Sequence, residues 1–232
     1  MDSYVAHPKH GPLPALLLAL TVVTGLVDAV SILSLGRVFV ANMTGNVVFI
    51  AFALAGTPGF SLRASLAALA GFLVGALLGG RMAQLTPHRG RLLRNAAVVE
   101  AALLLVALIL LFAIAHPGEL VRDGVAFLIA VALGVQNAAV RKLRVLDLTT
   151  TVLTMTLTGI AADLRTEGAK NAVRRALAVL SMFAGAAVGA LLVLHVDSAS
   201  AIAIALALVA CVALAAGLAS RTPAPWHDPI PG

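Results

Sequence analysis

The sequence predicts an all-α polytopic membrane protein, because of its composition, its spaced apolar segments and the placement of its basic loops. Hydrophobic residues make up 61% of the 232 positions, 11% are charged, and the mean hydropathy is +1.04. Water-soluble domains are far more polar. At about 20 residues per span, the chain has room for roughly eight crossings. Residues 1–232 are therefore predicted to form a single transmembrane domain.

Eight apolar segments follow one another, each bordered by polar residues, Gly or Pro. Six are long enough to cross a bilayer as helices. These six cover residues 13–35, 65–86, 95–115, 121–140, 173–194 and 198–219. The second and sixth segments, 39–56 and 148–162, are shorter and rich in Asn, Thr and Gly. Since no small-residue cleavage site is evident in the first segment, we interpret it as an uncleaved helix rather than a signal peptide.

The order of the segments repeats, which predicts two related halves of four elements each, residues 13–115 and 121–219. One of the matches, a pair of glycines in each half, has the small-xxx-small pattern that lets helices approach closely. The matches are Gly25-Leu-Val-Asp-Ala29 with Gly134-Val-Gln-Asn-Ala138, Thr44 with Thr154, and Gly71 and Gly75 with Gly185 and Gly189.

The basic loops favour six spans plus two re-entrant or broken segments. Arg and Lys gather in residues 81–94, 141–144 and 165–175, and cytoplasmic loops are the ones that carry such an excess. All three loops share one side only if segments 39–56 and 148–162 enter and leave on the same side. The N-terminus is then cytoplasmic and the two halves are inverted, as in many transporters. A bundle of eight full spans is the alternative.

The most concentrated polar cluster inside an apolar segment is Asn42, Thr44, Gly45 and Asn46. Gly45 permits a break in the helix, and Thr44 or Asn46 could cap a half-helix whose N–H groups face a polar or anionic solute. Asp28 lies about 15 residues into the first segment, where a carboxylate is costly and is expected to meet a cavity, a partner or a proton. The alternative for these side chains is hydrogen bonding between helices.

Polar residues of the second half supply the matching wall of the predicted site. They are Gln136, Asn137, Thr151 and Thr154, although a Thr hydroxyl often bonds only to its own helix. Glu100 is a second intramembrane acid. We expect it to pair with an arginine near the interface, with a proton relay as the alternative.

Other classes of function lack their motifs. Cys211 is the only cysteine, and the six histidines form no helical pair suited to haem or zinc. No HExxH, P-loop or GxSxG sequence occurs. The net charge of +6 is explained by the basic loops, so nucleic-acid binding is not expected. We therefore predict no metal, no cofactor and no enzyme.

Three stretches of this chain resemble the YoaK-like family of bacterial integral membrane proteins. They are the two Gly-to-Ala pentapeptides above and Phe39-Val-Ala-Asn-Met-Thr-Gly-Asn46, and the likeness covers nearly the whole chain. The resemblance implies a multi-pass protein of the bacterial cytoplasmic (inner) membrane with six or seven helices. It implies no substrate and no catalytic residue, because the family is a domain of unknown function.

The leading hypothesis is a small transporter or permease for a polar solute, with an anion as one candidate. The solute would sit between the two polar segments, with Asp28 as a candidate proton-coupling group. Its partners would be the lipid bilayer and the small solute, and a homo-oligomer is left open. The alternatives are a non-transporting membrane scaffold or assembly protein and, less favoured, an intramembrane enzyme.

Overall fold

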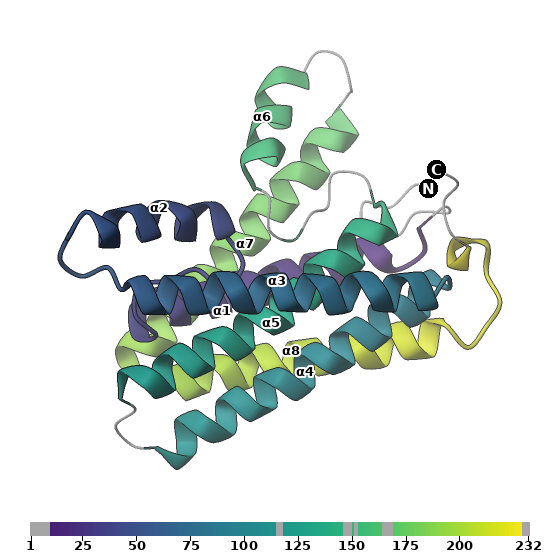
Figure 1. Cartoon of the computed structure of the whole chain (residues 1–232). Coiled ribbons are helices and arrows are strands. Elements are labelled where there is room, and N and C mark those ends of the chain that lie inside the picture. Colours follow the sequence, from purple (N-terminus) through teal and green to yellow (C-terminus); the bar gives the residue numbers. More distant parts are fainter. Residues whose placement is uncertain (1–9, 115–117, 146–149, 151–152, 164–168, 229–232) are drawn as a thin grey trace.

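The computed structural model of the chain describes residues 10–114, 118–145, 150, 153–163 and 169–228. Within these ranges the regular structure is helical (Figure 1). The α-helices are α1 (Leu13–Ser34), α2 (Met43–Leu54), α3 (Leu62–Leu85), α4 (Arg89–Ala113), α5 (Glu119–Leu143), α6 (Leu153–Asp163), α7 (Ala169–His195) and α8 (Ser198–Ala219). A short 3-10 helix, η1, covers Pro225–His227.

Six helices are long and apolar enough to cross a membrane, namely α1, α3, α4, α5, α7 and α8. Their outer faces carry large apolar side chains, among them Leu77 at 72% and Phe183 at 70% exposure. Such a surface suits lipid rather than water. The predicted helical membrane protein with six spanning helices is thereby confirmed.

The two polar segments are the short helices. In the second segment, α2 covers only residues 43–54. Residues 35–42, which connect the end of α1 to α2, have non-helical backbone. In the sixth, α6 has 11 residues. Neither reaches the roughly 20 residues that a spanning helix needs.

Capping residues fix several helix starts. The Ser61 hydroxyl accepts a hydrogen bond from Ala64 N at 3.2 Å, and the Asp197 carboxylate accepts one from Ser200 N at 2.6 Å. Hydrogen bonds from the side chain and the backbone of Ser200 lower the pKa of Asp197, because they stabilise its charged form. α4 starts at Arg89, six residues before the predicted start, since the basic residues of this stretch form its first turns.

Glycines bring two pairs of helices into close contact. A Cβ at Gly25 of α1 would lie 2.7 Å from Ala186 N of α7, and a Cβ at Gly134 of α5 would lie 2.8 Å from Ala76 N of α3. No side chain fits in either place, so backbone meets backbone. Thus α1 packs on α7, and α3 packs on α5.

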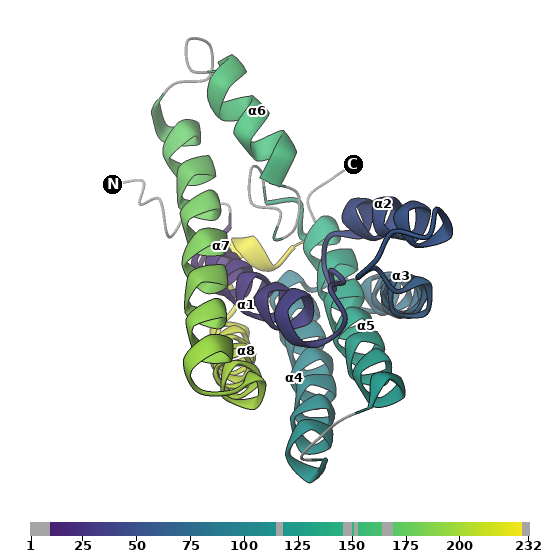
Figure 2. The same ribbon diagram turned by 90° about the vertical axis from the view of Figure 1, so that its left-hand side faces the viewer.

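The direction of each pair follows from its contacts. Along α3, the glycines at 71, 75 and 79 face residues 127, 131 and 135 of α5, so the two helices are parallel. The glycines at 185 and 189 of α7 face residues 22 and 26 of α1, so this pair is also parallel. Figure 2, a view along the bundle, shows α1 and α5 as its inner helices, with α4 and α8 closing one side.

The two pairs run in opposite directions. Ser198, the first residue of α8, donates a hydrogen bond from its Oγ to Oγ of Ser34, the last residue of α1, at 2.8 Å. A cavity of about 410 Å³ joins Ser34 to Ser61 and Glu119, which stand at the starts of α3 and α5. The end of α1 therefore lies beside the starts of α3, α5 and α8. Because α1 ends and α3 begins at the same end of the bundle, the segment that contains α2 enters and leaves on one side.

The bundle thus has two chemically different ends. The basic end holds the start of α4 and the ends of α3, α5 and α8. The mixed-charge end holds the end of α1 and the starts of α3, α5 and α8. Among the residues that the structure describes, the exposed cations at the basic end are Arg81, Arg91, Arg94, Arg141, Lys142, Arg144 and Arg221.

The termini close the basic end. Arg89 is buried and donates to Leu143 O at 2.6 Å and to Trp226 O at 3.2 Å, and its Nη2 lies 3.0 Å from His10 Nδ1. The Trp226 ring lies against Gly11 and Gly90. One guanidinium therefore links α4 to the end of α5 and to both terminal segments.

Candidate functional site

A buried carboxylate lies in the middle of the bundle. Glu100 is fully buried, and it stands 11 residues after the start of the 25-residue helix α4, about 16 Å along its axis. The expected partner of Glu100 was an arginine, whereas the structure places the amide of Gln136 of α5 beside it. The buried face of α4 carries small residues at 96, 97 and 107, so this face sits close to the neighbouring helices α5 and α8. The Glu100 side chain therefore has no path to the surface along α4.

Gln136 of α5 is the polar side chain that meets Glu100. With its amide nitrogen turned toward the acid, Nε2 lies 2.8 and 2.9 Å from the two carboxylate oxygens, and Oε1 accepts from Thr150 Oγ1 at 3.0 Å. This orientation pairs every donor with an acceptor when Glu100 is ionised. Gln136 is itself 1% exposed.

The opposite amide orientation suits the neutral acid. Nε2 then donates to the hydroxyl oxygens of Thr24 at 3.3 Å and of Thr150 at 3.0 Å. Oε1 faces Glu100, which can donate to it only when protonated. The Thr24 hydroxyl already donates to Leu20 O at 2.9 Å, so its oxygen is left as an acceptor. Gln136 can therefore satisfy either protonation state of Glu100 by turning its amide.

Asp28 is buried in α1 and binds the non-helical backbone that precedes α2. Its Oδ1 accepts from Val40 N at 3.1 Å and from Ala41 N at 3.2 Å. Its Oδ2 is buried without a hydrogen-bond partner among the residues that the structure describes. Asp28 thus holds residues 40–41 against α1 and keeps one oxygen for another group or a proton.

The predicted polar cluster in the second segment divides into two parts. Asn46 is fully buried, where its Nδ2 donates to Phe39 O at 2.6 Å and its Oδ1 accepts from Phe39 N at 2.9 Å. Gly45 gives room to the Phe39 ring, since a Cβ there would lie 2.5 Å from it. Asn42 and Thr44 are exposed instead.

The predicted residues of the second half are also dispersed. Gln136 is at the buried centre, Asn137 is half-buried and has polar partners, and Thr154 is exposed. Thr151 lies outside the described residues. α6 packs on α7 and, with the start of α7, stands away from the other helices in both views, whereas α2 packs on α3 (Figures 1 and 2). The structure does not bring α2 and α6 together.

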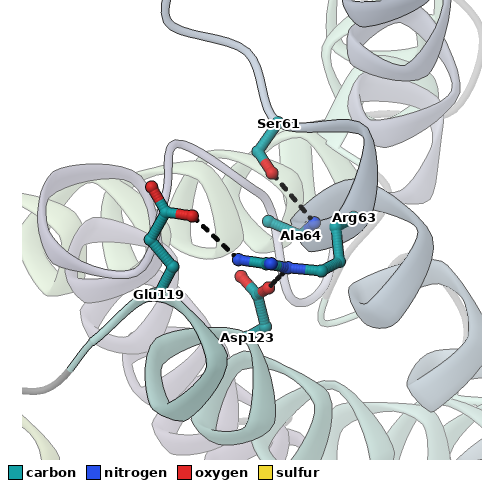
Figure 3. A network of polar contacts seen from close by, with 5 residues as sticks. All are labelled: Ser61, Arg63, Ala64, Glu119 and Asp123. Atoms are coloured by element: carbon teal, nitrogen blue, oxygen red, sulfur yellow. Dashed lines mark hydrogen bonds and ion pairs between the residues drawn. The ribbon is translucent and has the colours of Figure 1, made fainter.

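A second polar group lies at the mixed-charge end (Figure 3). Arg63 of α3 forms an ion pair with Asp123 of α5, and its Nη2 lies 2.9 Å from Glu119 Oε2. Ser61 caps the same turn of α3. Half of the Arg63 side chain is exposed, so these pairs fix the relative register of two parallel helices rather than add much stability.

No group of three or more His, Cys, Asp or Glu side chains suited to a metal ion occurs among the placed residues. The central polar group consists of one acid, one amide and two hydroxyls. Such a group can hold a proton.

The fold and this buried centre define a polytopic helical membrane protein with a buried acidic residue in one of its spanning helices. The chain belongs to the family described as "Protein of unknown function (DUF1275)", whose model matches residues 16–215. It is also similar to UPF0700 transmembrane protein YoaK of Bacillus subtilis (strain 168), at 31% identity over 188 residues, which cover 76% of this chain and 82% of that protein. No solved structure matches. The resemblance seen in the sequence is confirmed.

Sequence reasoning missed the pairing of Glu100 with Gln136. Both residues were visible as polar positions in apolar segments, and Gln136 was assigned to the site. The missing information was the contact between α4 and α5, because no local pattern says which helix faces another. The helical spacing of small residues around Glu100 was the available signal for its buried face.

Proposed function

We propose that the chain is a small secondary transporter or permease for a polar solute, coupled to protons at Glu100. The observation that carries the proposal is a fully buried carboxylate within the spanning helix α4, beside an amide whose N–H and C=O groups can each face it. A charged group inside the membrane is costly, and such groups mark ion and proton pathways. The proposal assigns no catalytic chemistry to the chain.

The arrangement of the helices supports inverted repeats over residues 13–115 and 121–219. Each half provides one member of both close pairs, α1 with α7 and α3 with α5. Gly25 and Gly134 occupy matching places in these pairs, which run in opposite directions. Inverted halves with short interrupted segments are a recurrent transporter architecture, in which the halves rock about a central site.

The solute site is proposed at Gln136, Thr24 and Thr150, next to Glu100. Asp28 and Asn46 then position the re-entrant segment, because their side chains bind its backbone. An anionic solute is not favoured. The N–H groups of Val40 and Ala41 already face the carboxylate of Asp28, which would repel an anion.

The alternative is a non-transporting scaffold, in which Gly71, Gly75, Gly185 and Gly189 serve packing. These glycines contact helices of the same chain, so they offer no surface to a partner. A homo-oligomer stays a prediction.

Proteoliposomes with an imposed pH gradient test the transport proposal. Across a panel of neutral and cationic polar solutes, we expect proton-driven uptake of at least one. Glu100→Gln is expected to abolish the dependence on the gradient while solute exchange continues, because the neutral amide cannot cycle a proton. Glu119→Gln is the control, since that carboxylate is 85% exposed at the mixed-charge end. Absence of uptake for the whole panel, or a gradient dependence that survives Glu100→Gln, would overturn the proposal.

We also propose that the basic end faces the cytoplasm of a bacterial inner membrane. Exposed Arg and Lys residues gather there, as expected of cytoplasmic loops. In a Cys211→Ala background, cysteines at Arg37 and Thr57 should react with an impermeant thiol reagent added outside. A cysteine at Gln84 should react only after permeabilisation. Labelling of residues 37 and 57 from opposite sides would contradict the re-entrant path of α2.

A further inference from the structure

A groove between α4 and α8 opens at the basic end of the bundle. Its volume is about 730 Å³. It is lined by Arg91, Arg94, Val98, Ala213, Leu214, Gly217, Leu218, Ser220 and Arg221. The two helices lie side by side over this stretch (Figure 1). The groove is separate from the buried centre at Glu100.

The groove has a cationic entrance. Its three charged lining residues, Arg91, Arg94 and Arg221, are all exposed and positive. No carboxylate is among the residues that line it. Asp228 lines the adjoining hollow of about 590 Å³ under the C-terminal segment. The field at the entrance therefore favours an anion.

Gly217 allows Arg94 to lie across the groove. A Cβ at this position would be 3.3 Å from Cδ of Arg94, so the aliphatic part of the arginine rests on α8. Its guanidinium is oriented by Asn95, whose Oδ1 accepts from Nε at 3.1 Å and from Nη2 at 2.8 Å. The cation is thus positioned at the groove rather than left to move freely in solvent.

The deeper part of the groove is apolar and open. Val98, Leu214 and Leu218 are 54%, 67% and 59% exposed. Val98 stands nine residues into α4, about 13 Å from its start, within the depth of acyl chains. Along the membrane normal the groove therefore changes from cationic at the surface to apolar inside. This sequence of chemistries matches a phospholipid.

We propose that this groove binds an anionic phospholipid. The phosphate lies between Arg91, Arg94 and Arg221, and one acyl chain follows Val98, Leu214 and Leu218. Basic pockets between membrane helices are suited to such head groups. A second copy of the chain fits less well, because its own groove would bring three more arginines against these. The inference does not depend on transport.

Native mass spectrometry of the full chain in neutral detergent tests the proposal with phosphatidylglycerol and phosphatidylcholine of the same acyl chains. We expect the wild-type chain to retain the anionic lipid at least tenfold more tightly. The double variant Arg94→Gln/Arg221→Gln should lose about 30-fold in affinity for phosphatidylglycerol and bind phosphatidylcholine as before. The control Arg81→Gln/Arg141→Gln removes the same charge from exposed positions at the same end and should change little.

A third variant tests the groove without removing charge. Gly217→Leu fills the floor under Arg94 and should also weaken phosphatidylglycerol binding, with all three arginines kept. Equal retention of both lipids, or an equal loss in the control, would overturn the proposal. So would tight binding of glycerol phosphate alone, which would indicate a free-anion site, or a dimer abolished by Arg94→Gln/Arg221→Gln, which would indicate an interface.

Discussion

At the scale of single residues, several polar side chains form hydrogen bonds with the backbone of an interrupted segment. Asn46 forms two hydrogen bonds with one residue, Phe39, and so replaces the pairing that a continuous helix would have provided. The core of a bilayer holds no water that could form hydrogen bonds with unpaired backbone N–H and C=O groups. The sequence motif around Asn46 is therefore explained first by the need to form hydrogen bonds with the non-helical backbone of this segment.

Asn46→Ala removes both bonds and should lower the free energy of unfolding by about 1–3 kcal/mol. Asn42→Ala, four residues earlier, should have almost no effect, because Asn42 is exposed and its side chain makes no capping bond. Thermal unfolding in detergent measures both. Equal destabilisation by the two variants would show that the Phe39 contact is not what matters.

His88 gives the basic end a pH dependence. Burial, with the nearby charges of His227 and Arg91, lowers its pKa below the ordinary 6.5. The unfolded chain therefore takes up the proton first as the pH falls. The stability that neutral His88 contributes is complete above 6.5 and is lost as the pH falls to the folded pKa.

Unfolding temperatures measured between pH 8 and pH 5 should decrease toward the acid side. His88→Asn, which keeps an N-cap acceptor for Arg91 N, should flatten this slope. His195→Asn, at an exposed position at the other end, should leave it unchanged. A slope that persists in His88→Asn would assign the effect to another group.

The candidate site residues could be picked out from the sequence more reliably than the contacts that each of them makes. Asp28, Asn46 and Gln136 stood out in the sequence because polar side chains are rare in apolar segments, and all three are buried. Asn42, Thr44 and Thr154 carry the same signal yet are exposed. The difference depends on which face of a short helix meets its neighbour, and 11 or 12 residues are too few to define a face.

At the scale of helices, glycine contacts determine the pairing. α3 presents Gly71, Gly75 and Gly79 to the backbone of α5. Lipid offers no hydrophobic driving force between helices, so close van der Waals packing must hold them together. The small-xxx-small pattern predicted close packing correctly but could not name the partner.

Gly75→Ala should separate α3 from α5, because the new Cβ would collide with Val131 O. We expect a loss of about 1–3 kcal/mol in the free energy of unfolding. Gly80→Ala on the same helix has nothing within 4 Å and should be neutral or stabilising by up to about 1 kcal/mol. Unfolding by SDS in mixed micelles compares them, and a neutral Gly75→Ala would refute the close contact.

At the scale of the whole molecule, each half of the chain depends on the other. α1 and α3 belong to the first half, and their glycine-packed partners, α7 and α5, belong to the second. Segment lengths and loop charges predicted six spans because both are local properties of the chain. The exchange of partners between halves is a long-range property that no local pattern contains.

Residues 1–116 and 117–232 expressed alone should not give stable folded proteins, since the main partners of α1, α3 and α4 lie in the second half and those of α5, α7 and α8 lie in the first. Co-expressed, they should assemble and co-purify through a tag on one half. Size-exclusion chromatography and thermal unfolding distinguish the cases. A cooperative unfolding transition from either half alone would contradict the interlocked arrangement.

The pairing of α1 with α7 also has a consequence for biogenesis. Gly25 meets its partner Ala186 only after about 160 further residues have been made, which takes roughly 8–30 s at usual rates of synthesis. During this interval α1 carries Thr24 and Asp28 into the membrane without its permanent neighbour. The insertion machinery must therefore keep the polar residues of α1 away from lipid until α7, the last helix but one, has been inserted.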